Sequence, residues 1–135
     1  MAFREISVEE LKDNPFTLIN KDWMLITAGN QQKHNTMTAS SLCFFGPEYR
    51  QALNFCGTKS GRDFDKDKET GLTPRFDDVA PYYEQARLVF LCRKLYRQDL
   101  EEGCFLDRDA FEKNYPQKDL HRMFIGEIVK VLEQA

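Results

Sequence analysis

Short apolar runs separated by polar turns predict a β-rich chain. Four such runs are expected to be strands, at residues 23–28, 42–45, 87–96 and 123–132. Residues 35–40 alternate small polar and apolar side chains, as a strand does when it packs one face and presents hydroxyls on the other. Gly126 inside the last run indicates a bulge or a tight bend.

Capping and breaking residues predict short helices between these strands. Helical segments are expected after the capping box at residues 7–10, from 48 to about 55, within 59–73, and from 107 to 115. Asn14-Pro15 should end the first segment and Gly57 the second. Strands and helices do not alternate regularly, so the residues alone favour a small β-rich barrel or sandwich, built as one domain over residues 1–135.

Composition and charge narrow the possible partners. The chain has 135 residues, of which 41% are hydrophobic and 30% charged, as expected for one globular domain. Its 19 basic residues against 22 acidic ones give a net charge of -3, which argues against a nucleic-acid or anionic-membrane partner. The apolar runs are too short to span a bilayer, and the N-terminal residues lack a secretory h-region, so a cytoplasmic protein is expected.

The four cysteines do not suggest a metal site or a catalytic thiol. No two of them have C-x-x-C spacing, and both histidines lie far from them in the sequence. Cys43 and Cys92 lie inside apolar runs and are expected to be buried. Cys56 precedes Gly57 in a polar stretch and is the one expected to be exposed.

Common enzyme motifs are absent, but three polar groups of residues remain. In residues 35–40, small side chains let a ligand approach the backbone amides and hydroxyls, although the same residues also suit an ordinary threonine-rich strand. In residues 59–66, Lys59 and Arg62 could hold a phosphate, or Arg62 could simply pair with a neighbouring aspartate on a solvated loop. His121, at the head of the last strand, could meet a ligand or bond a backbone carbonyl.

In this order along the chain, these segments closely resemble the flavin reductase-like family, the FMN-binding split barrels. The resemblance covers about residues 6–132. The matching segments are residues 21–29, 35–40, 56–63, 86–89 with 92–96, and 121–128.

The resemblance implies a six-stranded, Greek-key split barrel that forms a homodimer and binds FMN near the subunit interface. In the family, the stretch matching 35–40 lies along the flavin, the stretch matching 59–63 closes over the cofactor, and the histidine matching His121 approaches the site. The implied cofactor-binding residues are Asn35, Thr36, Met37, Thr38, Ala39, Ser40, Lys59, Ser60, Gly61, Arg62 and His121. FMN needs donors for its phosphate and ring atoms, and itself carries the hydride chemistry.

One departure from the family lies at the junction of Ser40 and Ser41. In relatives, the motif continues into a Trp-Gly-Gly turn, a proline-rich strand and an arginine-bearing segment that grips the phosphate. Here it passes directly into the apolar run at 42–45, so roughly 30–40 residues, two strands and a helix, are missing at ordinary element lengths. Either the protein carries an internal deletion, or the sequence joins two stretches across a segment that it omits.

Two classes of function follow from the resemblance. The first is an enzyme that uses NADH or NADPH to reduce flavin or another small acceptor. The second is a non-enzymatic FMN-binding or electron-carrying module, or a degenerate member that has lost the flavin. No side chain is assigned as a catalytic acid or base, because hydride transfer through flavin does not require one.

Overall fold

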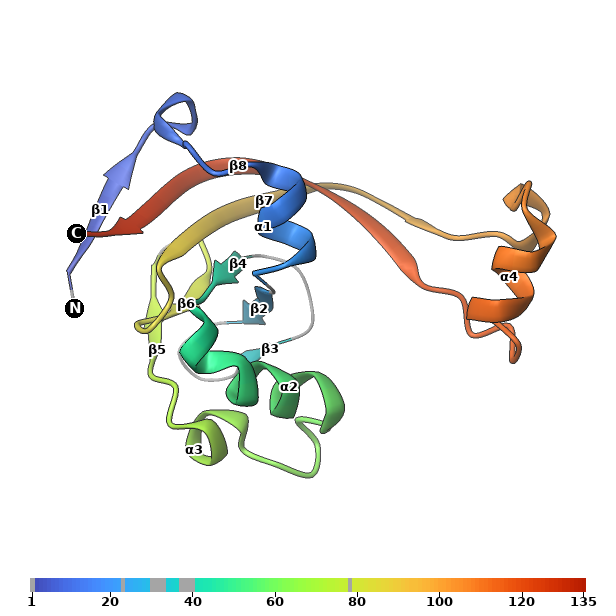
Figure 1. Cartoon of the computed structure of the whole chain (residues 1–135), viewed down its shortest axis with the longest axis horizontal. Helices are drawn as coiled ribbons and strands as arrows, with labels where there is room; N and C mark the ends of the chain where they lie inside the picture. Colours follow the sequence, from blue (N-terminus) through green and yellow to red (C-terminus); the bar gives the residue numbers. More distant parts are fainter. Residues whose placement is uncertain (1, 23, 30–33, 37–40, 78) are drawn as a thin grey trace. The chain divides into compact units, whose positions relative to one another are not determined.

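The computed structural model describes residues 2–22, 24–29, 34–36, 41–77 and 79–135. These residues form two compact units, each described by itself below (Figure 1). The first unit is Met1–Arg93 with Glu127–Ala135, and the second is Lys94–Gly126. Within the described ranges, no helix has the length and apolar character needed to cross a membrane.

A six-stranded, open antiparallel sheet dominates the fold and makes it β-rich, as the apolar runs predicted. Its strands, in spatial order, are β1 (Phe3–Ile6), β8 (Arg122–Gln134), β7 (Leu88–Asp99), β4 (Ser41–Phe44), β2 (Met24–Gly29) and β3 (His34–Thr36). A separate two-stranded sheet pairs β5 (Pro74–Phe76) with β6 (Pro81–Tyr83). The main sheet therefore has two edges, β1 and β3.

Seven short helices, four α and three 3₁₀, connect the described strands. They are η1 (Val8–Glu10), α1 (Pro15–Asn20), η2 (Pro47–Tyr49), α2 (Arg50–Thr58), α3 (Lys66–Thr70), η3 (Glu102–Cys104) and α4 (Arg108–Asn114). Three α-helices begin at a side-chain cap that accepts a hydrogen bond from an orphan backbone amide. The caps are Asn14 for α1, Asp65 for α3 and Asp107 for α4.

Most predicted elements are confirmed, with three corrections. The capping box at Ser7 forms, but it starts only a 3₁₀ turn. Asn14 caps a further helix, α1, which begins with Pro15 at its first position, where a missing amide costs nothing. Helix α2 continues through Gly57, because the Lys59 amide still donates to the Phe55 carbonyl (3.0 Å). Trp23, at the start of the first predicted strand, lies outside the described residues.

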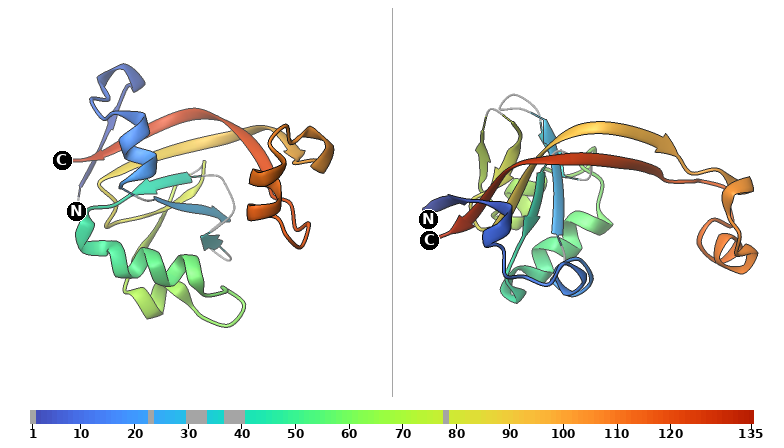
Figure 2. Two further views of the ribbon diagram at one scale, coloured as in Figure 1. Left: turned by 45° about the vertical axis from the view of Figure 1, so that its right-hand side comes forward. Right: turned by 90° about the horizontal axis from the view of Figure 1, so that it is seen from above.

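Both faces of the main sheet are covered in the first unit (Figure 2). Successive residues of β7 alternate between the faces: Val89 and Leu91 pack with residues of α2 and β6, whereas Leu88 and Phe90 pack with Leu18 of α1. An uninterrupted apolar run is what such a two-sided cover requires. The run at 88–92 therefore marks the centre of the core.

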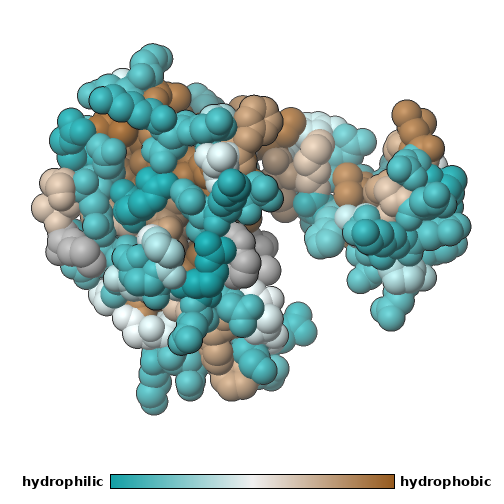
Figure 3. Space-filling view, viewed as in Figure 1, coloured by the Kyte–Doolittle hydropathy of each residue, from teal (hydrophilic) through white to brown (hydrophobic). Residues whose placement is uncertain are grey.

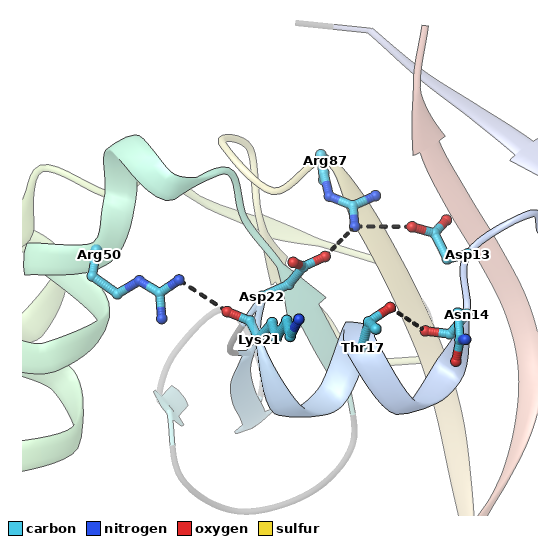
Figure 4. A network of polar contacts seen from close by, with 7 residues as sticks. All are labelled: Asp13, Asn14, Thr17, Lys21, Asp22, Arg50 and Arg87. Carbon is cyan, nitrogen blue, oxygen red and sulfur yellow. Dashed lines mark hydrogen bonds and ion pairs between the residues drawn. The ribbon is translucent and has the colours of Figure 1, made fainter.

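An arginine holds the α1 segment in place (Figure 4). Arg87, just before β7, donates to Asp13 on one side of α1 (3.0 Å) and to Asp22 on the other (2.6 Å). Burial works against its charged form, yet the bonds to Asp22 and Asp13 outweigh that effect and raise the pKa of the guanidinium. Arg50 of α2 adds a bond to the Lys21 carbonyl (2.9 Å).

The second unit contains the end of β7, the start of β8, and the tip that joins them. At the tip, η3 and α4 gather three aromatic rings, those of Phe105, Phe111 and Tyr115. Phe105 meets each of the other two rings edge to face, and Phe111 and Tyr115 are tilted against each other. The Leu100 amide donates to the His121 carbonyl (3.0 Å) and closes the base of the tip. Next to it, Arg122 binds Asp99 (2.5 Å), and this bond lowers the pKa of the carboxyl.

Candidate functional site

Hydroxyl-bearing residues occupy three successive positions across the sheet beside the predicted flavin segment. In the backbone register, Thr27 of β2 pairs with Thr36 of β3 on one side and with Ser41 of β4 on the other. Asn35 of β3 pairs with Ala28, next along the same strand. The register therefore brings Thr36, which belongs to the predicted segment, and Ser41, the residue that follows the segment, to the level of Thr27.

Thr27 has a buried hydroxyl that lacks a hydrogen-bond partner among the described residues. Its side chain is only 1% exposed. Leaving a buried hydroxyl unbonded costs about 1–3 kcal/mol, so native proteins seldom do so without a reason. A bound molecule with a donor or acceptor at this point would remove that cost.

Strand geometry places Thr27 on the side of the sheet that α2 covers. Side chains alternate along a strand, so Thr27 shares a face with Leu25, two residues away. Leu25 belongs to the apolar cluster that contains Leu53 and Cys56 of α2. Position 27 is thus where the apolar lining of this face gives way to a polar group.

The predicted phosphate-binding turn follows α2 directly and is exposed throughout. The Ser60 hydroxyl accepts from the Arg62 amide (3.1 Å), and its carbonyl accepts from the Asp63 and Phe64 amides. Lys59 and Arg62 make no ion pair within the part of the chain that the structure describes. The neighbouring Asp65 caps α3 instead, so the predicted alternative of an Arg62–aspartate pair is not formed.

His121 belongs to the second unit, where its Nδ1 lies 2.7 Å from the Tyr115 hydroxyl. The two rings also meet edge to face, with centroids 5.5 Å apart. The His121 side chain is exposed. It hydrogen-bonds the phenol of Tyr115, whereas the alternative expected from the sequence was a bond to a backbone carbonyl. Its proposed place at the flavin stays a prediction.

The predicted site residues other than His121 divide into three groups. Asn35 and Thr36 lie on β3, at the edge of the sheet, and Lys59, Ser60, Gly61 and Arg62 form the exposed turn after α2. Met37, Thr38, Ala39 and Ser40 lie outside the described residues.

One cysteine prediction is wrong. Cys56 is 1% exposed, because α2 extends past it and turns it inward beside Leu53. Cys43 is buried as predicted, Cys92 is partly buried with a pKa raised by that burial, and Cys104 is the exposed one. Among the described residues, no three His, Cys, Asp or Glu side chains are grouped so that they could hold a metal ion.

A second buried polar group has a structural explanation. The Tyr83 hydroxyl donates to Asp67 of α3 (2.7 Å), and burial together with this carboxylate raises the pKa of the phenol. Lys66 directly precedes Asp67, and its ammonium donates to the Cys56 carbonyl in the last turn of α2 (2.8 Å). These bonds join α3 to α2 and β6, and Thr27 has no equivalent bond in the described residues.

Comparison of the chain with protein-family models, curated proteins and solved structures finds no match. Any function must therefore be argued from the residues and their geometry. Thr27 is the functional candidate that sequence reasoning missed. The available signal was a single hydroxyl inside the apolar run Met24–Ala28, but only the strand register shows that it lies level with Thr36 and Ser41.

Proposed function

We propose that this chain is a cytoplasmic FMN-binding flavoprotein that uses NADH or NADPH to reduce flavin or another small acceptor, and that it works as a homodimer. The proposal starts from the resemblance of five segments to the flavin reductase-like family. The observation that supports it best is the buried hydroxyl of Thr27, which lacks a partner in the described residues. In the strand register it lies level with Thr36, inside the predicted flavin segment, and with Ser41, the residue after that segment.

The residues present suit the chemistry of FMN. Its ring carbonyls and nitrogens require donors and acceptors, and the Thr27 hydroxyl can offer one of them. Its phosphate requires donors and positive charge, and Lys59 and Arg62 have no competing ion pair among the described residues. The bound flavin would supply the hydride chemistry, while these residues bind and orient it.

Substitution of Thr27 by valine tests the flavin proposal, because it should change two quantities in opposite directions. Valine has nearly the same shape but no hydroxyl, so the flavin-free protein should gain about 1 kcal/mol in its free energy of unfolding when the unbonded group is removed. The same change should weaken FMN binding about tenfold, since one hydrogen bond to the cofactor is lost. Urea unfolding measures the first quantity and flavin-fluorescence titration the second.

Thr17→Val is the matched control. Thr17 is exposed on α1, and its hydroxyl bonds the Asn14 carbonyl (3.0 Å). This variant should leave FMN affinity unchanged. If Thr27→Val destabilises the flavin-free protein and leaves FMN affinity unchanged, the hydroxyl has an internal partner and its role at the flavin is refuted.

Steady-state kinetics distinguish the enzyme from a carrier. The enzyme should oxidise NADH or NADPH continuously when free FMN is supplied as acceptor. A carrier would bind FMN with the same fluorescence change but show no turnover with either donor.

A second candidate, a family member that has lost the flavin, is favoured by one topological observation. Strands β3 and β4 are both antiparallel to β2 and lie on its two sides, so they run parallel to each other. Parallel strands are ordinarily joined by a dozen residues or more, whereas only four separate Thr36 from Ser41. This short connection supports the interpretation that the family's phosphate-gripping segment is absent, and such a member would release all added FMN.

A further inference from the structure

The apolar neighbours of Thr27 restrict what can bond its hydroxyl. Thr27 shares a sheet face with Leu25, which packs in one cluster with Leu53 and Cys56 of α2. All four side chains are buried, and only the Thr27 hydroxyl lacks a described partner within this environment. A molecule that bonds Thr27 here must combine an apolar body with a polar atom at its edge. An aromatic heterocycle has this form, whereas a phosphate would lose its hydration among apolar groups.

The cations that suit a phosphate lie in a different environment. Lys59 and Arg62 belong to the turn after α2, and both are exposed. The surface around α2 and this turn is mostly hydrophilic (Figure 3). An exposed ion pair typically changes a binding constant no more than about fivefold, because water and salt screen the charges.

Two more deeply placed cations of the first unit are bonded to the protein itself. The Lys66 ammonium, in a side chain only 7% exposed, donates to the Cys56 carbonyl (2.8 Å). Arg87 binds Asp13 and Asp22. Recruiting either cation to a phosphate would break bonds that join helices to the sheet. A buried hydroxyl therefore faces the ring, and exposed cations face the phosphate.

We propose that the flavin site reads the ring and not the phosphate, so that riboflavin and FMN bind with similar affinity. The inference rests on the proposed function and narrows it to a substrate class, the flavins that share the isoalloxazine ring. The Thr27 hydroxyl bonds a polar atom at the edge of the ring, where burial makes a hydrogen bond strong. The phosphate lies toward solvent, where the charges of Lys59 and Arg62 are screened.

Fluorescence titration of the full chain with three ligands tests this inference. FMN, riboflavin and lumiflavin share the ring, but riboflavin lacks the phosphate and lumiflavin lacks the ribityl chain as well. The unchanged protein should bind riboflavin with a dissociation constant within about fivefold of that for FMN. Lumiflavin should also bind, because it retains the part that Thr27 contacts.

Two sets of variants separate the ring from the phosphate. Thr27→Val should weaken the binding of all three ligands by the same factor, about tenfold, since each loses one hydrogen bond. Lys59→Ala combined with Arg62→Ala should weaken FMN no more than about fivefold and leave riboflavin unchanged. Both turn residues are exposed, so their replacement leaves the core intact. Thr17→Val is the matched control and should change none of the three affinities.

Three results would overturn the inference and leave the proposed function standing. One is FMN binding more than about tenfold tighter than riboflavin. Another is a Thr27→Val variant that loses affinity for FMN alone, because the hydroxyl would then bond the phosphate end. The third is a loss confined to FMN and riboflavin, or no binding of lumiflavin, which would assign the hydroxyl to the ribityl chain. A protein that binds none of the three ligands would refute the proposed function and this inference together.

Discussion

Strand β7 passes through two different environments, and the exposure of its apolar side chains differs between them. In the first unit, Leu88 and Leu91 are 1% and 0% exposed, and the apolar run around them is covered on both faces. In the second unit, Leu95 and Tyr96 are about half exposed and lie between Lys94 and Arg97 in the sequence. An unbroken apolar run therefore belongs to a strand that the chain covers by itself. A short apolar pair flanked by cations belongs to a stretch of strand that the described residues of its own unit leave half exposed.

The largest predicted effect separates two leucines of this one strand. Leu91→Ala should lower the free energy of unfolding by about 2–5 kcal/mol, because it leaves a cavity in a close-packed core. Leu95→Ala should change it by no more than about 0.5 kcal/mol in the monomer, because its side chain is already 54% exposed. Urea denaturation at low protein concentration measures both. Similar costs for the two variants would contradict the contrast drawn between the units.

Two tyrosines extend the comparison to polar contacts. Tyr83→Phe removes a buried hydrogen bond to Asp67 and should cost about 1–2 kcal/mol. Tyr115→Phe removes the bond to the exposed His121 and should cost only a few tenths of a kcal/mol, because water replaces it. Thermal or urea unfolding of the two variants gives both values, and a larger cost at Tyr115 would mean that the tip is more closely packed than its exposure indicates.

The smallest effect is a response of the second unit to acid. Hydrogen bonds from Arg122 and Arg108 lower the pKa values of Asp99 and Glu102 in the folded state. Each group therefore stabilises the unit above its unfolded pKa, and that contribution disappears as the pH falls through the lower folded value. Protection of the amides in the strands and the tip of this unit, measured relative to the intrinsic exchange rate at each pH, should fall below about pH 4. Asp99→Asn should remove part of this response, whereas protection that stays constant with pH would refute the assignment.

How far the sequence predicts this fold depends on where the relevant contacts lie. Apolar runs predicted β2, β4, β7 and β8. Burial on two faces explains the pattern in β2, β4 and the first half of β7. In β8 only Val131 and Leu132 of the run are buried. Strand β1 was missed, since it contains Arg4 and Glu5 and becomes a strand only by pairing Phe3 with Gln134, which lies at the other end of the chain.

In the candidate site, too, the sequence does not predict features that depend on contacts between distant parts of the chain. Gly57 suggested the end of a helix and an exposed Cys56, but the burial of Leu53 and Cys56 against the sheet carries α2 beyond that glycine. The hydroxyl residues of 35–40 were visible in the sequence. Thr27 was not recognised, because its relation to Thr36 and Ser41 exists only in the strand register.

Flavin binding is the central claim, and an absorbance spectrum tests it most directly. The purified chain would be measured before and after incubation with excess FMN and desalting, together with Thr27→Val and the control Thr17→Val. The account predicts a retained flavin spectrum for the unchanged protein and for Thr17→Val, and a weaker one for Thr27→Val. A protein that is colourless after desalting would contradict the flavoprotein proposal and favour a family member that no longer binds FMN.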